Sequence, residues 1–302
     1  MKRNIFNPNL ILACRPRQWT KNFLVFSAPF FSLKFTFDLW ATSIISFLMF
    51  CLLSSSIYLV NDTLDINLDK LHPRKKKRPI ASGLVSVKEA LLCALIFFLF
   101  AIFLAGIISF KLIFIGLFYT SIQLGYCLYF KKKPILDIFC ISTGFLLRAI
   151  SSAFASSLYI SPWFLLSLGL LALFLAIEKR KSELKVCAER GIITRKVLLS
   201  YSLPLLNRYE NIVSTGSFVS YSLWAAGPSL NGASTQWMLL TVPLVLMGIF
   251  RYQLISNKEV KNVSKKFIST ENPEEILLKD QGIKFLLLLW IISIFLIGII
   301  FV

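Results

Sequence analysis

Long apolar segments, separated by short polar segments, account for most of the chain. Most of them are close to the length of about 20 residues that a helix needs to cross the hydrocarbon core of a bilayer. They are continuous, whereas barrel strands would alternate over about 10 residues. The pattern predicts an all-α, polytopic membrane protein with nine transmembrane helices, near 22–37, 41–60, 89–109, 111–130, 134–155, 162–178, 211–227, 236–255 and 284–302.

Composition supports the same class of protein. Charged residues make up 16% of the chain, against about 25% in a typical soluble domain, and the mean hydropathy is +0.72. The N-terminus has no short apolar core followed by a cleavage site, so we expect no cleaved signal peptide. We expect one integral membrane domain over 1–302, with large loops at 61–88, 179–210 and 256–283.

The net charge of +18 would suggest nucleic acid in a soluble chain. Its distribution indicates another cause. With the N-terminus inside the cell, every Lys and Arg except Lys34, Lys111 and Arg148 falls in a segment predicted to be cytoplasmic or at the cytoplasmic end of a predicted span. Basic residues gather in the cytoplasmic loops of membrane proteins. We therefore predict a cytoplasmic N-terminus, an outside C-terminus and no nucleic-acid partner.

Other residue types narrow the chemistry. The six cysteines form no CxxC pair, which favours small buried residues. His72 is the only histidine, which argues against a histidine metal site or a Ser-His-Asp triad. Asn272 and Pro273, followed by two acids, predict the start of a short cytoplasmic helix.

The strongest motif runs from Asn61 to Asp69, at the end of the second apolar segment. Asp62, Asp65 and Asp69 are spaced i, i+3 and i+7, which places them on one face of a helix. Negative charge at a helix C-terminus opposes the macrodipole, and charge at a membrane boundary suggests function. Carboxylate oxygens suit Mg²⁺, which often bridges protein and phosphate. We predict a magnesium-diphosphate site; the alternative is a solvated acidic helix end.

Five consecutive basic residues, 74–78, follow the acidic motif. Lys and Arg beside a metal site can hold the phosphates of a metal-bound polyanion. We select Lys75 and Arg78 as phosphate ligands. The alternative is that these residues are the basic residues usual in a cytoplasmic loop, or that they bind anionic membrane lipids.

Two further polar patches lie at later helices. Lys179, Arg180 and Glu183 are expected to face the same pocket if the helices close into a ring; the alternative is a helix cap. Arg148 lies within the fifth apolar segment, about 16 Å along the axis from Asp137, too far to pair with it. Arg148 is either a functional residue facing a cavity or the partner of an acid on another helix.

The form NDxxDxxxD at a cytoplasmic helix end, in a chain with nine apolar segments, resembles the UbiA superfamily of intramembrane prenyltransferases. Within it, several stretches look like the polyprenyl-phosphate phosphoribosyltransferase branch: 15–22, 72–83, 144–149, 179–183 and 273–280.

The resemblance implies a UbiA-like bundle around a central cavity open to the cytoplasm, in a bacterial inner membrane. It implies Mg²⁺-dependent transfer of 5-phosphoribose from phosphoribosyl pyrophosphate to a polyprenyl phosphate, in cell-envelope biosynthesis. Asp62, Asp65 and Asp69 would be the catalytic and metal-binding residues. The residues implied to bind substrate are Asn61, Lys21, Lys75, Arg78, Tyr126, Lys131, Arg148, Lys179, Arg180 and Glu183.

One departure from the wider superfamily bears on the choice of reaction. Members that use prenyl diphosphates carry a second acidic motif after the sixth helix, whereas this loop is basic, with only Glu183 in a comparable place. Two alternatives stay open: transfer of a prenyl group to an aromatic or other small acceptor, and a non-enzymatic transporter or lipid-binding protein. The oligomeric state is open, a homo-oligomer included.

Overall fold

The computed structural model describes residues 8–33, 36–71, 75–190, 195–258, 276 and 279–301. Within this part of the chain every regular element is a helix, which confirms the prediction of an all-α protein. Seven helices there are long and apolar enough to cross a membrane. His72 and the helix start expected at 272–273 lie outside the described residues. The count of nine spans and the cytoplasmic cavity stay predictions.

The contacts divide the chain into two compact units. Unit 1 comprises 1–30, 34–129 and 147–158, and unit 2 comprises 31–33, 130–146 and 159–302. The single domain expected over 1–302 stays a prediction, and each unit is described by itself.

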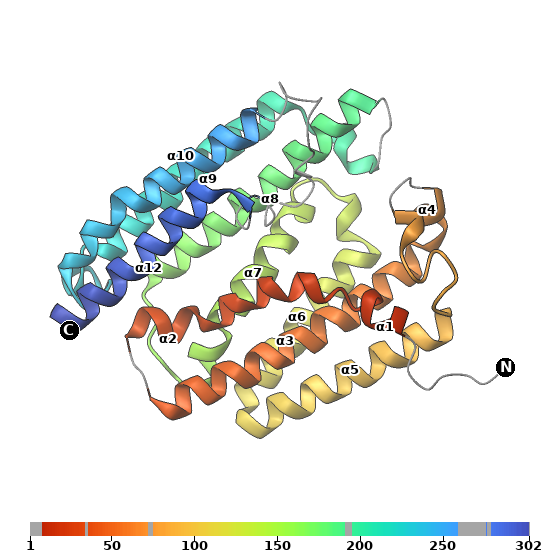
Figure 1. The fold of residues 1–302 in the computed structure, drawn as a ribbon, viewed down its shortest axis with the longest axis horizontal. Coiled ribbons are helices and arrows are strands. Elements are labelled where there is room, and N and C mark those ends of the chain that lie inside the picture. The colour runs from red at the N-terminus through yellow and green to blue at the C-terminus, as the bar shows by residue number, and fades with distance from the viewer. Residues whose placement is uncertain are drawn as a thin grey trace. The chain divides into compact units, whose positions relative to one another are not determined.

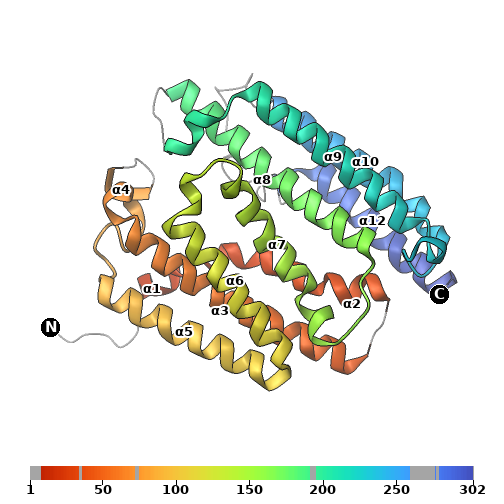
Figure 2. The same cartoon turned by 180° about the vertical axis from the view of Figure 1, so that it is seen from behind.

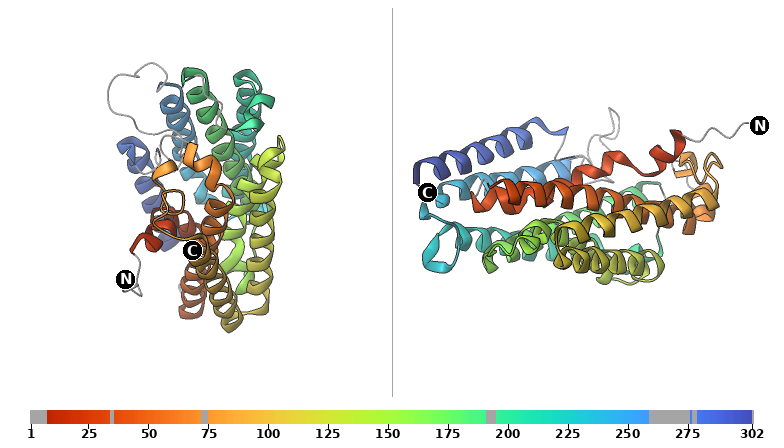
Figure 3. Two further views of the ribbon diagram at one scale, coloured as in Figure 1. Left: turned by 90° about the vertical axis from the view of Figure 1, so that its right-hand side faces the viewer. Right: turned by 90° about the horizontal axis from the view of Figure 1, so that it is seen from below.

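Unit 1 is built on three long helices that pack against one another: α3 (Phe37–Leu64), α5 (Val87–Ile108) and α6 (Phe110–Leu128). Figures 1 and 3 show α3 and α5 side by side along most of their length. The second part of α7 (Leu136–Ala155) also belongs to this unit. The shorter elements are α1 (Pro8–Ala13), η1 (Pro16–Phe26), α2 (Ser27–Ser32), which ends in unit 2, α4 (Ile66–Leu71) and η2 (Lys75–Lys77).

Small residues let α5 approach its neighbours closely. Its buried residues are four alanines on one face, Ala90, Ala94, Ala101 and Ala105. Small side chains at an interface allow close packing of membrane helices. Elsewhere α5 exposes large apolar side chains, such as Phe103, as a helix facing lipid would. The helix therefore has one protein-facing and one lipid-facing side.

A capping box fixes the start of α5. The Ser86 hydroxyl oxygen accepts a hydrogen bond from the Glu89 amide at 3.2 Å, and the Glu89 carboxylate accepts one from the Ser86 amide at 3.0 Å. This double cap satisfies two amides that have no partner within the helix. It thereby anchors the C-terminal end of the basic loop that follows the acidic motif.

Unit 2 consists mainly of α8 (Pro162–Arg190), α9 (Leu203–Ala225), α10 (Val242–Lys258) and α12 (Gln281–Phe301), with the first part of α7. Helix α8 packs along α9, α9 contacts α10, and α10 contacts α12 (Figure 2). Its short 3-10 elements are η3 (Phe130–Lys132), η4 (Lys196–Ser200), η5 (Pro228–Leu230) and η6 (Gln236–Thr241).

Two predicted spans differ from the apolar helices that were expected. The segment 22–37 falls on η1 and α2, so no single long helix forms there in the described residues. Segment 211–227 overlaps the second part of the 23-residue α9 (Leu203–Ala225), which begins eight residues earlier and ends two residues earlier than predicted. At about 34 Å, α9 is long enough to span, but its first half carries Arg208 and Glu210. The other seven segments coincide with the apolar helices, which identify an integral membrane protein.

All six cysteines lie in the described residues as free thiols, five of them buried and Cys93 half-buried. Burial raises the pKa of the Cys14 thiol to about 12, so it stays protonated at neutral pH. The interpretation of these cysteines as small packing residues is confirmed for the five that are buried.

Candidate functional site

The acidic motif lies where α3 ends and α4 begins. Asp65 interrupts the helix at φ −93° and ψ 8°. Helical hydrogen bonding nevertheless continues across the break, because the amide of Asp65 donates to Asn61 at 2.9 Å and that of Asp69 donates to Asp65 at 2.8 Å. Asp62 and Asp69 therefore come to the same side, and they are only 2% and 3% exposed.

Two arginines meet these carboxylates. Nη1 of Arg78 lies 3.1 Å from Oδ1 of Asp62 and 2.6 Å from Oδ2 of Asp69. Nη2 of Arg15 forms an ion pair with the same Oδ1 of Asp62. The side-chain nitrogen Nδ2 of Asn61 lies 3.5 Å from Oδ1 of Asp62. The site thus places two positive charges against two buried negative charges.

These residues fit a magnesium ion in part. A single nitrogen contacts both carboxylates, so an oxygen of Asp62 and one of Asp69 face the same point. Mg²⁺ in proteins is commonly held by one or two carboxylates plus substrate phosphates. The described residues contain no group of three or more His, Cys, Asp or Glu side chains arranged to hold a metal. Asp65 is half-buried at the break, and its metal role stays a prediction.

Arg15 is a site residue that was not predicted from the sequence, although it lies in the stretch 15–22 that carries part of the family resemblance. Its backbone is left-handed, at φ 53° and ψ 61°, in the turn between α1 and η1. The Arg15 amide donates to the Leu12 carbonyl at 3.1 Å, and its own carbonyl accepts from the Gln18 amide at 2.9 Å. Its guanidinium also lies over the Tyr58 ring, 4.8 Å from the centroid. In the sequence, Arg15 served only as one of the basic residues that predict a cytoplasmic N-terminus.

Arg148 is buried in unit 1 and bonded to neutral groups. Its Nε donates to Oδ1 of Asn22 at 2.7 Å and its Nη2 donates to the Tyr119 hydroxyl at 2.7 Å. The guanidinium also lies over the Tyr119 ring, 4.8 Å from the centroid. These contacts join η1, α6 and α7. The substrate-binding role of Arg148 stays a prediction.

In unit 2, Arg180 is completely buried between two carboxylates. Its Nε donates to Asp137 at 2.6 Å and its Nη1 donates to Glu183 at 2.5 Å. Tyr201 donates to the other oxygen of Asp137 at 2.7 Å, and burial raises the pKa of Tyr201. Arg195 lies 3.8 Å from Glu183. The structure thus brings Arg180 and Glu183 together; their substrate-binding role stays a prediction.

A second buried charge cluster in unit 2 had no signal in the sequence analysis. The Lys181 ammonium lies 2.7 Å from Glu178 on the same helix and also pairs with Glu210 on α9. Ser256 on α10 donates to Glu178, and Gln253 donates to Glu210 at 2.9 Å. The cluster therefore joins α8, α9 and α10. Glu210 stands alone in its segment, so no spacing pattern marks it.

The remaining predicted residues are half-buried. Lys21, Lys75 and Tyr126 lie in unit 1, and Lys131 and Lys179 lie in unit 2. Their substrate-binding roles stay predictions. Tyr126 and Lys131 fall in different units.

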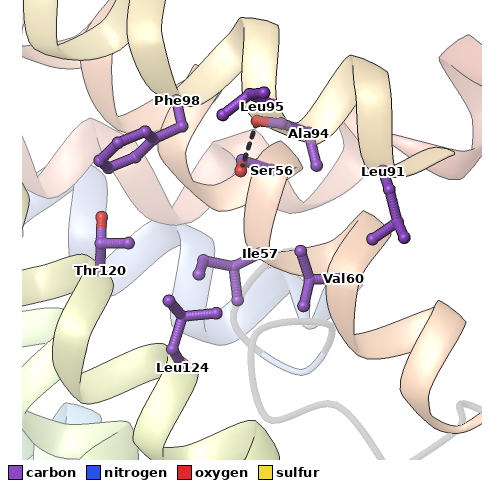
Figure 4. Close-up of a pocket in the computed structure, with 9 residues that line it drawn as sticks. All are labelled: Ser56, Ile57, Val60, Leu91, Ala94, Leu95, Phe98, Thr120 and Leu124. Carbon is purple, nitrogen blue, oxygen red and sulfur yellow. Dashed lines mark hydrogen bonds between the residues drawn. The ribbon is translucent and has the colours of Figure 1, made fainter.

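Unit 1 also contains an apolar pocket of about 230 Å³ between α3, α5 and α6 (Figure 4). Its polar lining residues are Ser56 and Thr120. The Ser56 hydroxyl donates to the Ala94 carbonyl, and the Thr120 hydroxyl donates to the Gly116 carbonyl, each at 2.8 Å. The remaining lining is aliphatic or aromatic. The pocket therefore suits hydrocarbon and offers no charge to a phosphate.

Fold and site together define a polytopic helical membrane protein with a carboxylate–arginine cluster at one helix end. The chain matches the model of the UbiA prenyltransferase family over residues 23–272, and it belongs to this family.

Two curated relatives are similar over nearly the whole chain. One, the decaprenyl-phosphate phosphoribosyltransferase of Mycolicibacterium smegmatis, is 34% identical over 93% of this chain and 90% of its own. The enzyme of the same name from Corynebacterium glutamicum is 33% identical over 94% and 85%. Among solved structures, a UbiA homolog from Archaeoglobus fulgidus bound to DMAPP and Mg²⁺ superposes with a TM-score of 0.70 at 18% identity, covering 97% of this chain and 99% of that one.

Proposed function

We propose that this protein transfers 5-phosphoribose from phosphoribosyl pyrophosphate to a polyprenyl phosphate, with magnesium as its cofactor, in a bacterial inner membrane. The similarity to decaprenyl-phosphate phosphoribosyltransferases over more than nine tenths of the chain carries this proposal. The pairing of buried acids with arginines beside a membrane helix supports it, because both substrates carry phosphate.

The reaction exchanges one bond for another at C1 of the ribose. An oxygen of the acceptor phosphate forms a bond to C1, while the bond from C1 to the diphosphate breaks and its electron pair leaves with the diphosphate. Magnesium would supply neutralisation of the leaving group's charge. Asp62 and Asp69 would hold the ion, and Arg78 would hold the diphosphate oxygens. The protein's main contribution is positioning and charge stabilisation.

The test is a transfer assay with the purified full-length protein. We expect ribose-labelled phosphoribosyl pyrophosphate, Mg²⁺ and polyprenyl phosphate to give a labelled lipid, and EDTA to abolish it. Asp62→Asn should reduce the rate by about 100-fold or more, because loss of a group stabilising developing charge typically costs this much. Asp38→Asn is a matched control, since Asp38 is an exposed aspartate in the first turn of the same helix.

The alternative reaction is measured in parallel. A labelled prenyl diphosphate with an aromatic acceptor should give no product. Prenyl transfer without ribose transfer would replace the proposal with the ordinary prenyltransferase reaction. Full ribose transfer by Asp62→Asn would remove this residue from the site.

A further inference from the structure

Two arginines contact the carboxylate oxygens that a metal ion between the acids would use. Nη1 of Arg78 contacts both Asp62 and Asp69, and Arg15 contacts the Asp62 oxygen that Arg78 also contacts. A cation and a guanidinium cannot hold the same oxygen lone pairs at full strength. Any divalent ion that binds these carboxylates must therefore compete with both arginines.

The arginines are placed so that they can change partner. Their side chains are 26% and 25% exposed, whereas those of the two aspartates are 3% and 4% exposed. The acids are thus fixed in the fold, and the guanidinium groups lie at its accessible edge. Arginine binds carboxylate and phosphate in the same planar geometry, so a phosphate can replace the carboxylate as its partner.

The backbone of Arg15 indicates that its position is built in. A non-glycine residue at positive φ is uncommon and persists where the surrounding structure fixes it. Here two backbone hydrogen bonds fix the turn, and the Tyr58 ring supports the guanidinium. Arg15 therefore reaches Asp62 from a segment 47 residues earlier in the chain.

We propose that Arg15 is a further residue of the diphosphate site, and that Arg15 and Arg78 exchange partners on binding. Without substrate they pair with Asp62 and Asp69. When a metal–diphosphate complex binds, the carboxylates hold the metal and the arginines hold phosphate oxygens. The inference rests on the proposed function for the identity of the ligand. It has a thermodynamic consequence: metal and diphosphate each favour binding of the other, because each stabilises the same rearrangement.

The test measures binding by the purified full-length protein without any donor or acceptor substrate. Mn²⁺ is the probe, because it takes the same oxygen ligands as Mg²⁺ and its free concentration can be read by electron paramagnetic resonance. We expect Arg15→Gln and Arg78→Gln to bind Mn²⁺ alone about fivefold or more tightly than wild type, since a competing cation is lost. The same variants should bind inorganic diphosphate about tenfold more weakly at saturating Mg²⁺.

Arg17→Gln is the matched control, because Arg17 is an exposed arginine two residues further on, in the first turn of η1. It should change neither affinity by more than about twofold. If Arg78→Gln fails to fold, Arg15→Gln carries the test alone. Mn²⁺ binding that is unchanged or weaker in Arg15→Gln overturns the inference. Opposite shifts in the two affinities uphold it even where the transfer assay is negative, so failure of the inference and failure of the proposed function are distinguishable.

Discussion

The charged side chains of this protein meet partners that lie far away in the sequence. Asp62 and Asp69 could be predicted to act together, because helical spacing alone places them on one side. Their partner Arg15 could not, since its contact depends on a left-handed turn that no residue pattern marks. Arg148 is a similar case, because Asn22 lies 126 residues away and is neutral. A sequence shows where an intramembrane arginine is, but not which neutral oxygens satisfy it.

The hydrogen bond from Arg148 to Tyr119 should contribute measurably to stability. Tyr119→Phe removes the hydroxyl and keeps the ring under the guanidinium. Hydrogen bonds to charged groups contribute about 1.5–3 kcal/mol, so we expect the free energy of unfolding in detergent to fall by about that amount. Tyr159→Phe, at an exposed tyrosine, is the control and should be neutral. A loss below about 0.5 kcal/mol for Tyr119→Phe would show that the bond is not stabilising.

At the scale of elements, apolar length predicts where a helix crosses lipid but not where it ends. The sixth apolar segment stops at residue 178, yet α8 continues to Arg190. Charged residues sustain the extra turns, because Lys181 pairs with Glu178 one turn earlier and with Glu210 on α9. The sequence marked Lys179, Arg180 and Glu183 at this helix end as pocket residues or as a helix cap. It could not show Glu210, since the contact depends on how α8 and α9 pack.

Lys181 should therefore be essential to the packing of α8 against α9. Lys181→Met leaves Glu178 and Glu210 buried without their cation, and breaking a buried pair typically costs about 3–5 kcal/mol. We expect a loss of this size in the free energy of unfolding. Adding Glu210→Gln should recover part of it, because one uncompensated charge is removed. The exposed Lys196→Met is the control. Strictly additive losses in the double variant would contradict this account.

For the molecule as a whole, composition and the length of the continuous apolar segments were sufficient to predict a helical membrane protein, and the seven apolar helices confirm it. The number of membrane crossings depends on segments that mix apolar and charged residues. For such a segment, composition alone does not show whether it crosses the membrane. Helix α9 is the clearest case. Its Glu210 is buried with Lys181 inside unit 2, and its exposed Arg208 lies near the helix start, where a long side chain can reach the interface. Neither charge needs to face lipid.

We therefore expect α9 to cross the membrane, with Lys196 on the cytoplasmic side and Ser229 outside. Both residues are exposed and flank the helix. In intact cells an impermeant maleimide should label Ser229→Cys, and it should label Lys196→Cys only after permeabilisation. The parent protein gives the background, because its thiols are buried or half-buried. Labelling of both variants from one side would mean that α9 does not cross. In that event α10 would start from the cytoplasm and carry the basic segment after it outside, against the tendency that places Lys and Arg within.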